Sequence, residues 1–168
     1  MSNFVAGLWH PIGGADHILA MVAIGLWGVI AGGRALWVWP AAFVTMVLAG
    51  FAAAIFGVHV PFVQPAIGAS IVVLGLLIGL AVKAPLCLGA AIAGLFAFFH
   101  GHAHGTEAAV AGTGLLAFAC GFSLTTAFLH AVGLGAGMFI ARSAGEPLLR
   151  ASGGLVAFSG LALIAGAA

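Results

Sequence analysis

Long apolar stretches fill most of the chain, and short breaks containing glycine, proline or a charged residue separate them. An α-helix needs about 20 consecutive apolar residues to cross a bilayer. The pattern predicts helices over six stretches, residues 13–31, 36–57, 65–82, 84–104, 108–141 and 148–167. We therefore expect an all-α, polytopic integral membrane bundle of about six transmembrane helices, which forms a single transmembrane domain over residues 1–168.

The fifth stretch is longer than the others. Residues 108–141 exceed the ~20 residues that one perpendicular span requires. We expect a re-entrant or interfacial segment near residues 108–113, followed by a helix that runs through His130 to Ile140.

Composition supports the membrane class. The chain is 64% hydrophobic and 4% charged, with a mean hydropathy of +1.32, whereas soluble domains carry about 25% charged residues. The lipid bilayer is therefore its expected environment.

A net charge of +1 excludes the strongly basic surface of a nucleic-acid-binding protein. Cys87 and Cys120 lie far apart in apolar runs, so we expect neither a disulfide nor a cysteine metal site. A signal peptide is not expected, because no basic segment precedes the first stretch.

The few positive charges predict the orientation. Arg34, Lys83, Arg142 and Arg150 all fall in or beside alternate connections between the predicted spans. Because cytoplasmic loops carry an excess of lysine and arginine, these connections should be cytoplasmic and both termini should lie on the outer, periplasmic side. The tryptophans fit interfacial belts, with one near the outer boundary and three near the inner boundary, namely Trp9 and then Trp27, Trp37 and Trp39.

Glycine pairs one helical turn apart indicate close helix packing. They occur at Gly28 and Gly32, at Gly75 and Gly79, and at Gly133 and Gly137. Small residues at this spacing let two helix backbones approach each other. The same glycine-rich faces would allow a homo-oligomer to form.

A histidine-rich motif, FHGHAHGTE, ends the fourth stretch. If the helix continues through it, His100 and His104 share one face, Glu107 lies about 20° from His100, and His102 faces the opposite side. If Gly101 and Gly105 unwind the helix, all three rings could turn to one side. Either geometry offers imidazole and carboxylate ligands, which suit Ni²⁺, Co²⁺, Zn²⁺ or Cu²⁺. The alternative is a polar loop at a helix end.

A second motif, HPIGGADH, opens the first stretch and contains His10, Asp16 and His17. A carboxylate in an apolar span is costly, so Asp16 indicates a functional site. The alternative is that Asp16 is the N-cap of the helix and that His17 is interfacial. Met21, one turn below His17, is either a soft ligand or a packing residue.

The predicted topology brings the polar candidates to one side of the membrane. The outer side receives nine of them: His10, Asp16, His17, His59, Gln64, His100, His102, His104 and Glu107. From these we predict a metal site formed by His10, Asp16, His17, His100, His104 and Glu107. Secondary candidates are Met21, His59, Gln64, His102 and His130. Deep in the fifth span, His130 is either a second station for the ion or a core histidine bonded to a neighbouring backbone or hydroxyl group.

Together, HPIGGADH, FHGHAHGTE and the segment GFSLTTAFLHAVGLG resemble the HupE/UreJ family of nickel and cobalt permeases, which is associated with hydrogenase and urease maturation. The resemblance implies a multi-pass protein of the bacterial inner membrane that takes up Ni²⁺ or Co²⁺ as its substrate, with no prosthetic group. It places five residues on matching motif positions, namely His10, Asp16, His17, His104 and Glu107. The first motif is also similar to the H-x4-D-H element of a larger nickel/cobalt transporter family, but here five residues separate His10 from Asp16.

Three other functions are alternatives to a permease. A membrane accessory or sensor protein would hold nickel through the same ligands without transporting it. A channel for a small neutral solute would not need carboxylates beside histidines. An enzyme could use Ser123 and His130, which lie two turns apart, but the sequence contains neither G-x-S-x-G nor H-E-x-x-H. The chain also has no Walker A sequence, so we expect no ATP hydrolysis by it.

Overall fold

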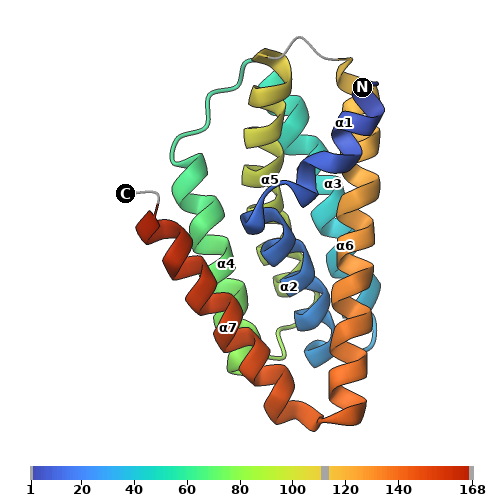
Figure 1. Ribbon diagram of the computed structural model, residues 1–168, viewed down its shortest axis with the longest axis vertical. Helices are drawn as coiled ribbons and strands as arrows, with labels where there is room; N and C mark the ends of the chain where they lie inside the picture. The colour runs from blue at the N-terminus through green and yellow to red at the C-terminus, as the bar shows by residue number, and fades with distance from the viewer. Residues whose placement is uncertain (1, 111–113, 167–168) are drawn as a thin grey trace.

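The computed structural model of the chain describes residues 2–110 and 114–166, and every regular element in these ranges is helical (Figure 1). In chain order the elements are α1 (Asn3–Trp9), the short 3₁₀ helix η1 (His10–Ile12), α2 (Ala15–Ala31), α3 (Ala35–Ile55), α4 (Val63–Gly79), α5 (Leu86–Val110), α6 (Leu115–Ser143) and α7 (Gly145–Gly166). They form an elongated bundle in which α3 packs along α5, α4 along α7 and α2 along α6. Because α2 also contacts α3, α4 and α7, it lies at the centre.

Several of these helices can cross a membrane. Four are long and apolar enough by themselves, namely α3, α5, α6 and α7. The segments Asn3–Ile12 and Ala15–Ala31 pass the same test together as a pair bent by 75°, which gives up to five spans among the described residues. At 17 residues, α4 is apolar but shorter. The chain is therefore a multi-pass membrane protein, while the count of six spans and the orientation remain predictions.

The expectation for the fifth stretch is wrong in part. Residues 108–110 form no separate re-entrant segment, because α5 continues to Val110, and the rest of that expected segment lies outside the described residues. The predicted helix through His130 is confirmed as α6, which has 29 residues. At 1.5 Å per residue it is about 43 Å long, so it must tilt or project beyond a hydrocarbon core of about 30 Å.

Close contact between α3 and α5 explains the two glycines of the histidine-rich motif. A Cβ atom at Gly101 would overlap the Val47 carbonyl oxygen, and one at Gly105 would reach the Phe51 carbonyl oxygen. The glycines therefore mark the seam where α5 lies against α3, and the helix continues unbroken through both of them. Of the two geometries that the motif allowed, the chain adopts the helical one.

Two of the tryptophans predicted for the inner belt lie in the core instead. Trp27 and Trp39 are fully buried, with their ring centroids 4.1 Å apart. The Trp27 indole N–H donates to the Val82 carbonyl at 2.8 Å, and that of Trp39 donates to the Leu86 carbonyl at 2.9 Å. Buried indoles need such acceptors, so these side chains hold the connection between α4 and α5 against the bundle. Trp37 is exposed, as a belt residue should be.

Two of the three predicted glycine pairs pack against the chain's own helices, whereas Gly32 follows the end of α2 and a Cβ there would meet nothing within 4 Å. A Cβ at Gly75 would overlap the backbone of Ala157 on α7, and a Cβ at Gly133 would overlap the carbonyl of Val22 on α2. These two faces therefore serve packing within one chain. Association of several copies remains a prediction.

Candidate metal centre

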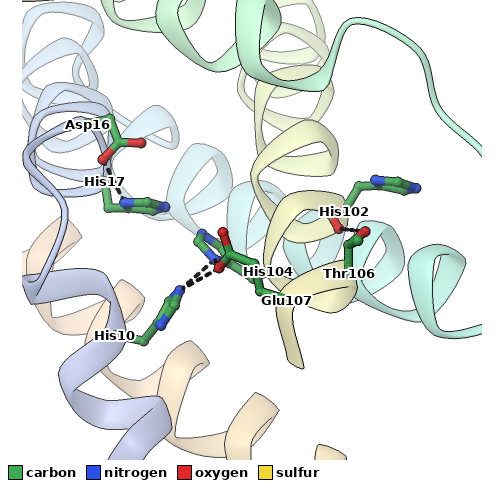
Figure 2. Close-up of polar contacts among 7 residues, drawn as sticks. All are labelled: His10, Asp16, His17, His102, His104, Thr106 and Glu107. Carbon is green, nitrogen blue, oxygen red and sulfur yellow. Dashed lines mark hydrogen bonds and ion pairs between the residues drawn. The ribbon is translucent and has the colours of Figure 1, made fainter. Parts of the chain in front are cut away.

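The first helix, which the apolar pattern did not predict, brings His10 to the site. Helix α1 lies against α6, where a Cβ at Gly121 would overlap the Phe4 carbonyl oxygen. The Thr125 hydroxyl of α6 donates to the Leu8 carbonyl of α1 at 2.8 Å. With α1 fixed in this way, η1 turns the chain into α2 and places His10 beside the C-terminal half of α5 (Figure 2).

Helical geometry sorts the side chains of the α5 motif into two groups. His100 and His104 face the interior between α2 and α6, and Glu107 lies on the same side of α5 at the surface, whereas His102 points away from them (Figure 2). His102 Nε2 donates to the Val58 carbonyl at 2.7 Å. This bond ties α5 to the connection between α3 and α4, so His102 has a structural role.

Three side chains from separate turns converge in what we call the outer cluster, which is His10, His104 and Glu107. His10 Nε2 lies 2.8 Å from His104 Nδ1 and 3.2 Å from Glu107 Oε2, and His104 Nδ1 lies 3.3 Å from the same oxygen (Figure 2). One ligand atom from each residue lies within 4.8 Å of the other two. The side chain of Glu107 is 54% exposed and that of His104 only 2%. The cluster therefore runs from an accessible carboxylate to a buried imidazole.

Asp16 and His17 form the second half of the site, at the start of α2. His17 Nδ1 lies 2.8 Å from Asp16 Oδ1, and Gly14 leaves the space that both side chains occupy. The N-cap of α2 is Gly14, and Asp16 lies in the first turn. The alternative that Asp16 is the N-cap is therefore wrong. The His17 ring centroid lies 4.4 Å from that of His104 and 5.7 Å from that of His100, so the two motifs meet.

Three buried imidazoles each have a ring nitrogen with no hydrogen-bond partner in the described part of the chain. These atoms are Nε2 of His17, His100 and His104, and in His17 also Nδ1, whose contact with Asp16 is an ion pair only. In His100, Nδ1 donates a hydrogen bond to the Phe96 carbonyl at 2.9 Å, and Nε2 is the nitrogen that has no partner. An imidazole that donates through one nitrogen keeps a lone pair on the other, which is the usual arrangement of a metal-binding histidine.

The secondary candidates do not join the outer cluster. His59 and Gln64 are exposed and line a hollow of about 490 Å³ that also reaches Glu107. Met21 is fully buried in the core below His17. His130 lies deeper on α6, and Ser123 Oγ has no hydrogen-bond partner among the described residues, so the serine–histidine pair of an enzyme does not form.

Aromatic side chains, which the sequence analysis did not single out, enclose the histidines. The Phe122 ring centroid lies 4.7 Å from that of His104, and the Phe118 centroid lies 5.3 Å from that of His10. Phe118 and Phe122 are one turn apart on α6, and this i, i+4 aromatic spacing was the available signal. These rings form an apolar wall on the buried side of the site, and apolar surroundings strengthen electrostatic interactions.

The sequence model of the family described as HupE / UreJ protein matches residues 1–163, a range that contains every residue of the site. The chain belongs to the HupE/UreJ family. Among curated relatives, Protein HupE of Rhizobium leguminosarum bv. viciae is 41% identical over 162 residues, which cover 96% of this chain and 84% of the relative. No solved structure matches the chain. The family inferred from the two motifs is thus confirmed, and in this HupE/UreJ protein the side chains of the two motifs lie in contact.

Proposed function

We propose that this HupE/UreJ protein is a permease of the bacterial inner membrane that takes up Ni²⁺ or Co²⁺ from the outer side for metalloenzyme maturation. The observation that carries the proposal is the outer cluster, in which two imidazole nitrogens and a carboxylate oxygen lie within 4.8 Å of one another. Nitrogen and oxygen ligands of this kind favour Ni²⁺, Co²⁺, Zn²⁺ or Cu²⁺ over Mg²⁺ and Ca²⁺, which prefer sites made of oxygen alone.

Each residue has a distinct role in the proposed uptake. Glu107 attracts the hydrated cation at the hollow, and His10 and His104 replace part of its water shell. Asp16 orients His17, which offers its free Nε2 on the inner side of the cluster. The membrane potential, worth about 2.3 kcal/mol per charge for each 100 mV, can draw a divalent cation inward without ATP.

The proposed orientation agrees with the course of the helices. Helix α2 begins at the site and ends next to Arg34, whereas α5 begins just after Lys83 and reaches the site near its end. The site and these positive charges therefore lie at opposite ends of the bundle. With α4 as the sixth span, the positive end is cytoplasmic and both termini are periplasmic.

Metal uptake by purified protein in sealed vesicles tests the proposal. We expect a dye trapped inside the vesicles to report faster entry of Ni²⁺ or Co²⁺ than of Mg²⁺, with Zn²⁺ and Cu²⁺ compared in parallel. Binding without entry would contradict the permease and indicate an accessory or sensor protein. Neither binding nor entry would favour the neutral-solute channel.

Binding of the cation should weaken as the solution becomes more acidic. Only the neutral imidazole ring can act as a ligand, so protons compete with the metal. We expect titration calorimetry to show weaker Ni²⁺ binding at pH 5 than at pH 7.5. Equal affinity at the two pH values would contradict ligation by histidine.

A further inference from the structure

His130 is a buried polar residue that does not belong to the outer cluster. It lies on α6, its exposed fraction is 1%, and neither of its ring nitrogens has a hydrogen-bond partner among the described residues. The hydroxyl of Thr126, one turn nearer the outer cluster, is likewise fully buried and unpartnered in this part of the chain. Burying polar atoms without partners costs free energy. The sequence left open the alternative that His130 is a core histidine bonded to a neighbouring backbone or hydroxyl group. No such bond forms among the described residues.

Packing between α2 and α6 fixes the direction of this side chain. A Cβ at Gly133 would overlap the Val22 carbonyl oxygen, and one at Gly25 would lie 2.6 Å from the His130 carbonyl oxygen. The two backbones are therefore in contact at this level, and α6 cannot rotate without a clash. Thr126, His130 and Gly133 all belong to its buried face, so both polar side chains point into the bundle.

A series of ring contacts connects the outer cluster with His130. The His17 ring lies beside that of His104, and the His100 ring beside that of His17. Next comes Phe43, whose ring centroid lies 5.9 Å from that of His100 and 4.9 Å from that of His130. His130 therefore lies at the far end of a series of packed rings that begins at His104, next to Glu107.

We propose that His130, together with the Thr126 hydroxyl, forms a second and inner binding station for the same divalent cation. Its function as a step in transport rests on the proposed permease. The station offers a neutral imidazole and a hydroxyl oxygen, and the outer cluster keeps the carboxylate. A site without a carboxylate binds a divalent cation less tightly, so the ion can leave it toward the cytoplasm. Conduction requires sites that are favourable enough to enter and weak enough to leave.

The test measures binding and uptake of Ni²⁺ by the full-length chain. Equilibrium dialysis over micromolar to millimolar NiCl₂ should show that His130→Leu binds one ion fewer per chain than the parent protein. Uptake into vesicles should fall at least about tenfold, the loss typical of a disturbed metal site. His130→Gln, which keeps a polar donor and acceptor, should retain the ion at reduced affinity.

A second pair of variants guards against misfolding of His130→Leu. Thr126→Val preserves the shape of the side chain and should weaken the second binding step several-fold. Its matched control is Thr45→Val, because the Thr45 hydroxyl is exposed and donates to the Ala41 carbonyl of its own helix. Thr45→Val should bind nickel as the parent does.

The number of bound ions separates this proposal from the permease itself. If the parent protein binds nickel but admits none, the proposed function fails, while loss of one ion in His130→Leu still supports the station. If folded His130→Leu binds as many ions as the parent, the inner station is refuted whatever the rate of uptake. If His130→Leu does not fold, an unchanged second binding step in Thr126→Val refutes it.

Discussion

Replacing Glu107 with glutamine is expected to lower Ni²⁺ uptake by at least about tenfold, the low end of the loss seen when a metal-site partner is removed. Glu107 Oε2 lies 3.2 Å from His10 Nε2 and 3.3 Å from His104 Nδ1, so its charge acts directly on both rings. Glutamine has nearly the same size, and the variant should therefore fold. The measurement is nickel uptake by cells, normalised to the amount of protein in the membrane.

The chain provides a matched control for this experiment. Glu146 also lies in a helix, in the first turn of α7 at the end of the bundle opposite the outer cluster. Glu146→Gln removes the same charge from the chain without touching the site and should transport as the parent does. Equal losses in Glu107→Gln and Glu146→Gln would show that overall charge matters, and that a local ligand does not. Parental uptake by Glu107→Gln would remove Glu107 from the site.

Asp16→Asn should reduce uptake to a similar extent, through a different mechanism. Asp16 Oδ1 lies 2.8 Å from His17 Nδ1, and under the proposed function the carboxylate orients the ring and favours a lone pair on Nε2. Asparagine preserves the shape of the side chain but loses the charge. Because Asp16 lies in the first turn of α2, its interaction with the helix dipole is also lost, which costs only about 0.3–1 kcal/mol of stability.

Stability and transport measured together decide what Asp16 does. We expect the melting temperature of purified Asp16→Asn to change little while its nickel uptake falls at least about tenfold. If uptake stays at the parental level, Asp16 serves only the helix dipole, and the site reduces to the outer cluster. A variant that is absent from the membrane would point to a folding role instead.

Local patterns in the sequence predicted the class of the protein and most of its helices. Apolar length and the scarcity of charge indicate a membrane bundle, because lipid leaves a spanning chain few alternatives to helices. The spacing of His100, His104 and Glu107 correctly predicted a shared face once the segment proved helical. The prediction of an interfacial tryptophan belt was wrong for Trp27 and Trp39. Hydropathy cannot distinguish a ring that faces lipid from one whose N–H donates to a buried carbonyl.

The short N-terminal helix shows why the rest of the site could not be predicted. Its position depends on the contact with α6 at Gly121 and Thr125, more than a hundred residues away along the chain. No periodicity in the first ten residues encodes that contact. As a consequence, the sequence named His10 as a candidate without indicating which of the other candidates it would meet.

The sequence by itself determined the types of the candidate ligands, the family and the separation of histidines from positive charges, because each of these is a property of residue identity and local order. Only the tertiary structure decided which ligands meet. It joined His10 to His104, 94 residues later, through the 75° bend before α2. It also bonded His102 to a backbone carbonyl and left both nitrogens of His130 unpartnered among the described residues. Such outcomes depend on how distant helices pack, since a hydrogen-bond partner or its absence is set by neighbours in space.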